Sequence, residues 1–298
     1  MNPRSSADTA QVGWVERSET QQIVGLRRCA PNPTYIETIL RQVLVISDWM
    51  RAIMSTNHQS PVTNHWPVPV LAIDGPSGSG KGTVGQLLAT RLGWHFLDSG
   101  ALYRALGFVA IKNGIDINDT ETLLGLVDRM EIHFLPQTGA PPKVFLNGDD
   151  VGDAIRTEEA GRLASLLAAR PEVRRALLHK QHSLRVPPGL VADGRDMGTV
   201  VFPDAILKIF LTASAEVRAE RRYKQLKDKG FDVNLRRLLD EIRERDARDA
   251  GRKASPLKAA TDALLLDTSA QGITAVVERI HALLLERLAS GVAGRGEA

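Results

Sequence analysis

A strand-like run, a glycine-rich loop and a helical pattern follow one another without a gap between residues 68 and 92, and this succession constrains the fold most. Val68–Ile73 is a continuous apolar run, which is typical of a strand buried on both faces of a parallel sheet. Lys81–Leu92 repeats apolar residues at helical spacing, at Val84, Leu87, Leu88 and Leu92. We therefore predict that a strand, a tight loop and a helix form the first unit of an α/β fold.

Further strand candidates follow along the chain and are separated by segments with helical patterning. The strands are expected at Trp94–Leu97, Leu190–Ala192, Ala205–Leu211 and Ala263–Leu266, and two of the helices at Ser214–Lys229 and Gly272–Leu288. Strands that alternate with helices predict a parallel sheet with right-handed crossovers. The expected fold class is α/β, with helices flanking the sheet.

The stretch between the second and third strand candidates has a different pattern. Glu131–Leu135 and Lys143–Leu146 are short runs with a period of two, and the turn signal Asn147-Gly148 follows, so a small antiparallel β element is expected. Helical patterns come next, at Glu158–Ala169 and Pro171–Leu184. We interpret residues 127–184 as a substrate-side insert on the main domain.

Composition limits the partners that are expected. The net charge is only +3, and Lys and Arg are interleaved with Asp and Glu, so nucleic acid is not an expected partner. Cys29 is the single cysteine, which excludes an internal disulfide and fits a reducing compartment. No apolar run is long enough for a membrane span and the N-terminus shows no secretory signal, so we predict a cytoplasmic protein without a membrane partner. A monomer is expected.

The patterned sequence covers residues 67–292, which we predict to be one domain. Residues 1–66 show weak periodicity apart from a helical pattern at Thr34–Met50. A targeting or regulatory arm is one interpretation of this extension, but we favour a disordered tail or an over-long start with Met54 as the true initiator. Residues 293–298 are expected to be a short tail.

The loop after the first strand has the composition of a phosphate-binding loop. It reads Gly-x-x-x-x-Gly-Lys directly between a strand and a helix, the context that such a loop requires. Backbone N–H groups and the helix N-terminus would face the phosphates, and Lys81 would reach the β- and γ-phosphates of ATP. A simple turn would not need this lysine. The predicted ATP-binding residues are Gly75, Pro76, Ser77, Gly78, Ser79, Gly80, Lys81, Gly82 and Thr83.

One position departs from the usual loop pattern. Ser or Thr normally follows the lysine and its hydroxyl binds Mg²⁺, whereas here Gly82 intervenes before Thr83. This spacing is similar to that of nucleoside-monophosphate kinases. Direct binding of Mg²⁺ by a hydroxyl is therefore not expected, and ATP oxygens and water would hold the ion.

Two segments near strand ends carry candidate anion-binding residues. Ser99 is expected to cap a helix after the second strand, and Arg104 lies within reach of an anion near that helix start. After the third strand, Asp193 could hold Mg²⁺ through water, Arg195 could bind phosphate, and Asp196 could accept from a base amino group. The alternatives are a capped helix with a solvated arginine and an Arg–Asp pair on a surface turn.

Arginines also recur on two later helices. Arg245, Arg248, Asp249 and Arg252 are spaced to share one face of the helix expected at Leu235–Arg252, where arginine could neutralise phosphoryl charge and a carboxylate could hold ribose hydroxyls. Ordinary intrahelical Arg–Asp pairs are the alternative. The helical segment within 215–232 is interpreted as a lid over ATP, with Arg218, Arg221 and Arg222 on it.

Taken together, the motifs resemble those of bacterial cytidylate kinases over about Val68–Leu288. They occur in one order, as residues 75–83, Asp98–Arg104, Ile155-Arg-Thr157, Ala192–Asp204 and Glu244–Asp249. The resemblance implies a five-stranded parallel core, a lid and an enlarged monophosphate-binding insert. It also implies transfer of the γ-phosphoryl group of ATP to CMP or dCMP, with Mg²⁺ as the cofactor.

The resemblance further implies roles for individual residues. Ser165, Arg174 and Asp196 would recognise cytosine, and Arg104 and Arg195 would hold the acceptor phosphate with Ser99 nearby. Arg245 and Asp249 would bind the ribose. The expected catalytic residues are Lys81, Arg195, Arg222 and Arg252. Two other functions stay open: a kinase for another nucleotide or small metabolite, and an ATP-binding switch that transfers no phosphate to a small molecule.

Overall fold

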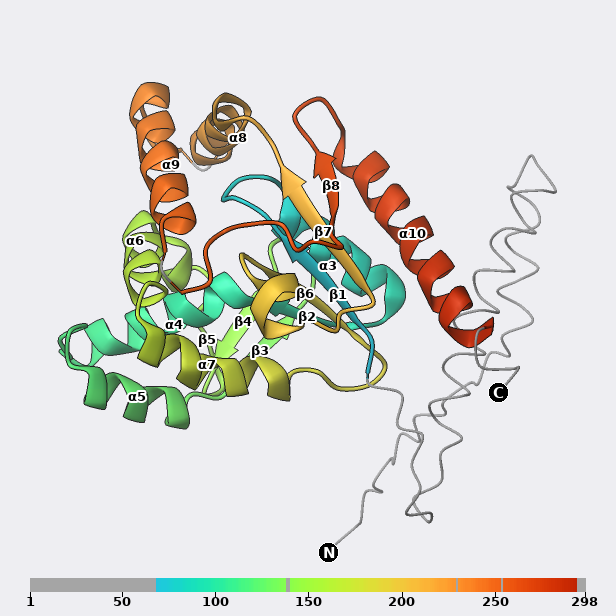
Figure 1. The fold of residues 1–298 in the computed structure, drawn as a ribbon. Coiled ribbons are helices and arrows are strands. Elements are labelled where there is room, and N and C mark those ends of the chain that lie inside the picture. Colours follow the sequence, from blue (N-terminus) through green and yellow to red (C-terminus); the bar gives the residue numbers. More distant parts are fainter. Residues whose placement is uncertain (1–67, 138–139, 229, 253, 294–298) are drawn as a thin grey trace, which may run out of the picture. The chain divides into compact units, whose positions relative to one another are not determined.

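A five-stranded parallel sheet forms the centre of the part of the chain described by the computed structural model, which covers residues 68–137, 140–228, 230–252 and 254–293 (Figure 1). The strands are β1 (Val70–Asp74), β2 (His95–Asp98), β6 (Leu190–Gly194), β7 (Leu207–Thr212) and β8 (Leu264–Asp267). Their order is β2-β6-β1-β7-β8, and every neighbouring pair is parallel. The predicted α/β fold class is confirmed.

Several predictions concern residues outside this described part. They are the extension at 1–66 with its helical pattern, Cys29, Met54 and the final residues of the tail. Within the described ranges, no helix is both long enough and apolar enough to cross a membrane.

Strand β1 is buried on both faces, as its continuous apolar sequence predicted. Ile73 faces α3 (Lys81–Leu92), because a Cβ added at Gly85 of that helix would lie 3.7 Å from its Cδ1. Val70 and Ala72 alternate with Ile73 and belong to the core on the other side of the sheet. The carboxyl end of β1 leads directly into the phosphate loop. Packing on both faces of β1 therefore fixes the position at which the loop begins.

The segment between β2 and β6, called the insert from here on, includes the predicted residues 127–184 and contains more regular structure than its sequence indicated. It comprises α4 (Ser99–Lys112), α5 (Thr120–Arg129), β3 (Ile132–Leu135), β4 (Lys143–Leu146), β5 (Asp149–Asp150), η1 (Ala154–Arg156), α6 (Glu158–Leu167) and α7 (Pro171–Ser183). The antiparallel order β3-β4-β5 confirms the predicted β element. Helix α5 and the two-residue β5 were not predicted.

The insert shares one hydrophobic core with the parallel sheet. Leu97 of β2 and Leu190 of β6 lie in the same buried cluster as residues from every larger part of the insert, including Leu102, Leu123, Ile132, Val144, Leu167 and Leu177. All of these side chains are at most 6% exposed. The insert is therefore packed onto the sheet as a continuation of its core.

Four helical elements complete the fold. A π-helical turn, η2 (Met197–Val201), follows β6 and was not predicted. Helices α8 (Ala215–Asp228) and α9 (Leu235–Ala250) pack together at one end of the sheet (Figure 1). Helix α10 (Ile273–Ala293) follows β8 and packs against α3.

Candidate active site

The phosphate loop is shaped by glycines and braced from behind by two side chains. Gly75 has φ 153°, and a Cβ there would lie 2.0 Å from the carbonyl oxygen of Leu211, so only glycine fits. Arg218 donates to the carbonyl oxygen of Ser77 at 3.0 Å, and Thr268 donates from Oγ1 to that of Ser79 at 3.0 Å. The loop is thus held to α8 and to the residue after β8.

Lys81 lies buried at the start of α3 beside Asp193. Its Nζ donates to the carbonyl oxygen of Pro76 at 3.5 Å and lies 3.7 Å from Oδ1 of Asp193. Burial lowers the pKa of Lys81, and nearby Arg195 lowers it further, against the opposing effect of Asp193. Burial likewise raises the pKa of Asp193, and Lys81 opposes that shift. The pair forms a polar site at the base of the loop.

The structure explains why glycine follows Lys81. A Cβ at Gly82 would lie only 3.1 Å from Oδ2 of Asp193, so a side chain at this position would crowd the carboxylate. If serine or threonine stood at position 82, its side chain would therefore come close to the carboxylate of Asp193. Thr83 is exposed one residue further along the helix.

The predicted cap of the helix after β2 is wrong by one residue. Asp98 caps α4, and its Oδ1 accepts from the backbone N–H of Ala101 at 3.0 Å. Ser99 is the first residue of the helix, and a Cβ at Gly194 would lie 3.0 Å from its Oγ. Ser99 thus lies next to the end of β6, where Arg195 follows.

Four arginines and one carboxylate form what we call the arginine cluster, comprising Arg104, Arg195, Arg245, Asp249 and Arg252. Arg195 donates from Nε to Oδ2 of Asp249 at 2.9 Å, and Arg252 pairs with the other carboxylate oxygen. The Asp249 side chain is only 2% exposed. Burial would raise its pKa, but Arg195, Arg252 and Arg245 together hold that pKa below the usual value.

The cluster contains more positive charge than its single carboxylate can balance. Burial together with Arg195 and Arg104 lowers the pKa of Arg245 to about 10. The Nε atoms of Arg104 and Arg245 are buried and have no hydrogen-bond partner among the described residues. Such a site favours an anion with several oxygens, for example a phosphate group.

Arg174 and Asp196 form a second buried pair close by. Arg174 of α7 donates to Oδ2 of Asp196, and its guanidinium carbon lies 6.0 Å from the ring centre of Tyr103. Burial raises the pKa of Tyr103 to about 12. Ser165 of α6 is 5% exposed, and its Oγ has no partner among the described residues.

Two predicted arginines make contacts on the outside of this arrangement. Arg222 of α8 pairs with Glu158 at the start of α6, with Nε to Oε1 at 2.9 Å, and its side chain is 35% exposed. Arg248 lies 3.7 Å from Glu244, with 46% of its side chain exposed, whereas Asp249 is buried and Arg245 is partly buried. The face predicted on α9 therefore consists of Arg245 and Asp249, with Arg252 just after the helix end.

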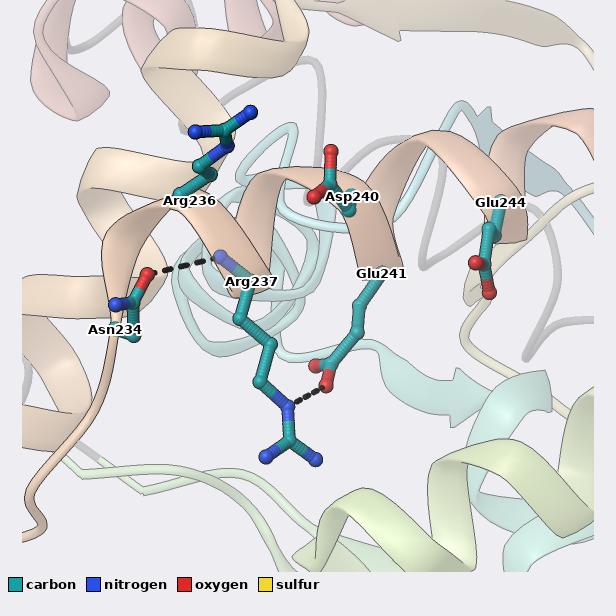
Figure 2. Close-up of a pocket in the computed structure, with 6 residues that line it drawn as sticks. All are labelled: Asn234, Arg236, Arg237, Asp240, Glu241 and Glu244. Carbon is teal, nitrogen blue, oxygen red and sulfur yellow. Dashed lines mark hydrogen bonds and ion pairs between the residues drawn. The ribbon is translucent and has the colours of Figure 1, made fainter.

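A separate hollow of about 590 Å³ lies along the first turns of α9 (Figure 2). Figure 2 shows Arg237 bonded to Glu241 on the same helix, and the other lining residues are Asn234, Arg236, Asp240 and Glu244. None of the predicted site residues lines this hollow. The predicted loop, Ser99 and Asp193–Asp196 residues lie instead at the carboxyl ends of β1, β2 and β6.

Sequence reasoning missed two residues that support the site, Asp74 and Thr268. Asp74 accepts two backbone N–H groups from η2, and Thr268 donates to the phosphate loop. Arg218 was predicted on the lid, but its bond to the phosphate loop was not predicted. Asp74 could have been noticed as a carboxylate at the end of an otherwise apolar strand. Thr268 forms a hydrogen bond with Ser79, which lies 189 positions earlier in the chain, and no local sequence pattern predicts such a contact.

Comparison with known proteins identifies the family to which this chain is related. A model of the family described as cytidylate kinase matches residues 71–286. The cytidylate kinase of Pseudomonas aeruginosa (strain UCBPP-PA14) is 59% identical over 214 residues, which are 72% of this chain and 93% of that protein. Those of Stutzerimonas stutzeri (strain A1501) and Aeromonas salmonicida (strain A449) are 57% and 55% identical, covering 76% and 74% of this chain and 99% and 95% of theirs.

A solved gluconokinase from Sinorhizobium meliloti 1021 aligns with 78% of this chain and 99% of its own at 20% identity. Its TM-score is 0.38, which is too low to add to the assignment. The family match spans most of the chain, and the relatives are matched over nearly their whole length. This chain therefore belongs to the cytidylate kinase family.

Proposed function

We propose that this enzyme transfers the γ-phosphoryl group of ATP to CMP or dCMP, giving ADP and CDP or dCDP, with the residues described above. The observation that carries the proposal is the placement of Lys81 3.7 Å from Asp193, which lies two residues before Arg195 of the arginine cluster. A donor phosphate on the loop and an acceptor phosphate on the cluster would therefore lie close together. Holding two reactants in this way is the main contribution of a phosphoryl-transfer site.

The phosphate loop would bind the donor. Its backbone N–H groups would face the ATP phosphates, and Lys81 would contact the β- and γ-oxygens. Mg²⁺ would neutralise phosphate charge when bound, held by ATP oxygens and by water in contact with Asp193. Asp193 suits this role because its Oδ1 is buried and accepts no hydrogen bond from the described residues.

The arginine cluster would bind the acceptor. Arg104 and Arg195 would hold the CMP phosphate near Ser99, and Arg245 and Asp249 would bind the ribose. The Arg174–Asp196 pair and Ser165 would recognise cytosine, since a carboxylate can accept from the 4-amino group and a guanidinium can donate to the ring. The two buried pairs support this assignment because both already hold donors and acceptors in fixed positions.

Transfer requires positioning and charge neutralisation but no general base. A phosphate monoester is already anionic at neutral pH, so its oxygen attacks the γ-phosphorus in line as the bond to the β-phosphate oxygen breaks. Lys81, Arg195 and Arg252 would stabilise the charge on the transferring group. Arg222 would join them when the lid at residues 215–232 closes and excludes water.

A steady-state assay with ATP and equal concentrations of CMP, dCMP, UMP, AMP and GMP tests this function. We expect CMP and dCMP to react at least tenfold better than AMP and GMP, because Asp196 accepts from an amino group on a small base. Equal rates with AMP and CMP would refute cytosine recognition. ATP hydrolysis unaffected by every monophosphate would indicate a switch protein.

Asp196→Ala provides the second arm of the test. This change removes the partner of Arg174 but leaves the phosphate loop intact, so the KM for CMP should rise much more than the KM for ATP. Equal effects on both substrates would argue that Asp196 supports the fold and does not bind the base. The cytoplasmic location, the monomeric state and the domain limits stay predictions.

A further inference from the structure

Asp74 is a buried carboxylate that has no role in the proposed reaction. It is the last residue of β1, directly before Gly75 of the phosphate loop, and it is 5% exposed. Its Oδ1 accepts from the backbone N–H of Met197 at 2.8 Å, and its Oδ2 accepts from that of Gly198 at 2.8 Å. Both oxygens therefore bind the first two residues of the turn η2.

The turn η2 needs a partner for these N–H groups. Its later donors are satisfied locally, with Val200 and Val201 donating to the carbonyl oxygen of Asp196. The first N–H groups of a helical turn have no partner within the turn. The side chain of Asp196 makes no capping bond because it pairs with Arg174. Asp74 therefore takes the place of a local cap from the neighbouring strand.

The backbone that Asp74 holds continues directly into the acceptor residues. Asp74 pairs in register with Gly194, so the chain leaves β6 at that point, passes Arg195 and Asp196, and returns to Asp74 at Met197. Both ends of this four-residue segment, from Gly194 to Met197, are thus fixed to the last residue of β1. A shift of η2 would displace the two side chains that face CMP.

We infer that Asp74 is a positioning residue for acceptor recognition, which fixes Arg195 and Asp196 through the N–H groups of Met197 and Gly198. This inference rests on the proposed function, because the residues that Asp74 positions are those assigned to CMP. Asp74 is not among the residues assigned to either substrate. It also joins the two halves of the site, since the phosphate loop begins at the next residue.

The burial of Asp74 supports a role of this kind. Burial raises its pKa to about 7, the N–H groups of Gly198 and Met197 oppose the shift, and the nearby carboxylates of Asp196 and Asp193 add to it. An ionised carboxylate at this position is costly for folding. The two hydrogen bonds to η2 offset this cost, and an apolar residue at the end of β1 could not form them.

The test compares the full chain with its Asp74→Asn variant in steady-state assays with ATP, CMP and UMP. Asparagine has the same shape, but only its Oδ1 can accept, so one N–H of η2 loses its acceptor. We expect the kcat/KM for CMP to fall about 10- to 100-fold. The preference for CMP over UMP should fall with it, and the KM for ATP should change less than about twofold.

The control is Ile73→Val, which removes one buried methylene from the preceding residue and leaves both bonds of Asp74 in place. This variant should lose some thermal stability but keep the wild-type preference for CMP over UMP. If Asp74→Asn also loses only stability, or if its KM values for ATP and CMP rise by the same factor, Asp74 has a structural role and the inference is wrong.

Gly198→Ala decides the question if Asp74→Asn does not fold. A Cβ at Gly198 would lie 3.1 Å from Cδ of Lys208, which is closer than an ordinary contact, and 3.4 Å from Oδ2 of Asp74. Relief of the Lys208 contact by a shift of the turn would move the N–H groups that Asp74 holds. We expect a smaller loss in the same direction, about 3- to 10-fold in kcat/KM for CMP. Unchanged CMP kinetics would contradict the inference. Failure of the wild-type chain to phosphorylate CMP would instead refute the proposed function.

Discussion

Replacing Asp249 by asparagine tests the electrostatics of the arginine cluster. The change keeps the size of the side chain but removes the charge that balances Arg195 and Arg252, whose side chains are only 15% and 7% exposed. Removal of one partner from a buried ion pair costs about 3–5 kcal/mol. We expect about 3 kcal/mol here, since Arg195 keeps a bond to the carbonyl oxygen of Gly194 at 3.2 Å.

Urea unfolding followed by circular dichroism at pH 7 measures this loss in the free energy of unfolding. Glu244→Gln is the matched control on the same helix, because the Glu244 side chain is 71% exposed and lies 3.7 Å from Arg248. It should cost less than about 0.5 kcal/mol. A loss below about 1 kcal/mol for Asp249→Asn would show that the cluster does not depend on this carboxylate.

The pH dependence of the same loss gives a second check. The pKa of Asp249 is held below its ordinary value of 3.8, so its ionised form stabilises the folded state above that value. This stabilisation is lost as pH falls through the lower, folded-state pKa. The difference between the wild type and Asp249→Asn should therefore be constant at neutral pH and shrink below pH 3.8. A difference that grows on acidification would contradict the assignment.

Four further predictions follow from the structure. Lys81→Met should lower kcat/KM at least about 10³-fold in a coupled ADP assay and should also lower the temperature of unfolding, because buried Asp193 loses its charged partner; a loss of activity below tenfold would argue against a phosphate contact. Gly75→Ala should cost more than about 3 kcal/mol in urea unfolding, because its Cβ would lie 2.0 Å from the Leu211 carbonyl oxygen; wild-type stability would mean that the loop has another conformation. Arg222→Gln should lower kcat at least about tenfold and Glu158→Gln less than about twofold, whereas equal effects would reduce their contact to a surface ion pair. A chain starting at residue 67 should keep full CMP kinase activity in the same assay, and loss of activity would overturn the prediction that residues 1–66 are dispensable.

Sequence patterns correctly predicted the strands, loops and helices that have a clear local signal. The strand, loop and helix of residues 68–92 were recovered because a buried strand, a glycine-rich loop and an amphipathic helix each have a clear local signal. The helix bounds Lys81–Leu92 agree to the residue. The cap of α4 was predicted at Ser99, but it is Asp98. Both residues are good helix caps, and only the backbone conformation decides between them.

Contacts between distant segments escaped prediction for a physical reason. The periodicity of α9 placed Arg248 with Arg245 and Asp249, but a helix advances 100° per residue, which puts Arg248 at the edge of that face, where it contacts Glu244. The bonds of Asp74, Arg218 and Thr268 depend on how strands and loops meet in space. The cytosine roles of Ser165 and Arg174 came from the resemblance alone and stay predictions.

The hydrophobic core that joins the insert to the sheet limits how this enzyme could be engineered. Leu102, Leu123 and Leu177 are fully buried in the same cluster as Leu97 and Leu190 of the sheet, so excising the insert would open an apolar surface on β2 and β6. A smaller acceptor site could not be made by deletion alone. Acceptor specificity would have to be changed by substitutions on the polar side of α6 and α7, with their buried leucines left in place.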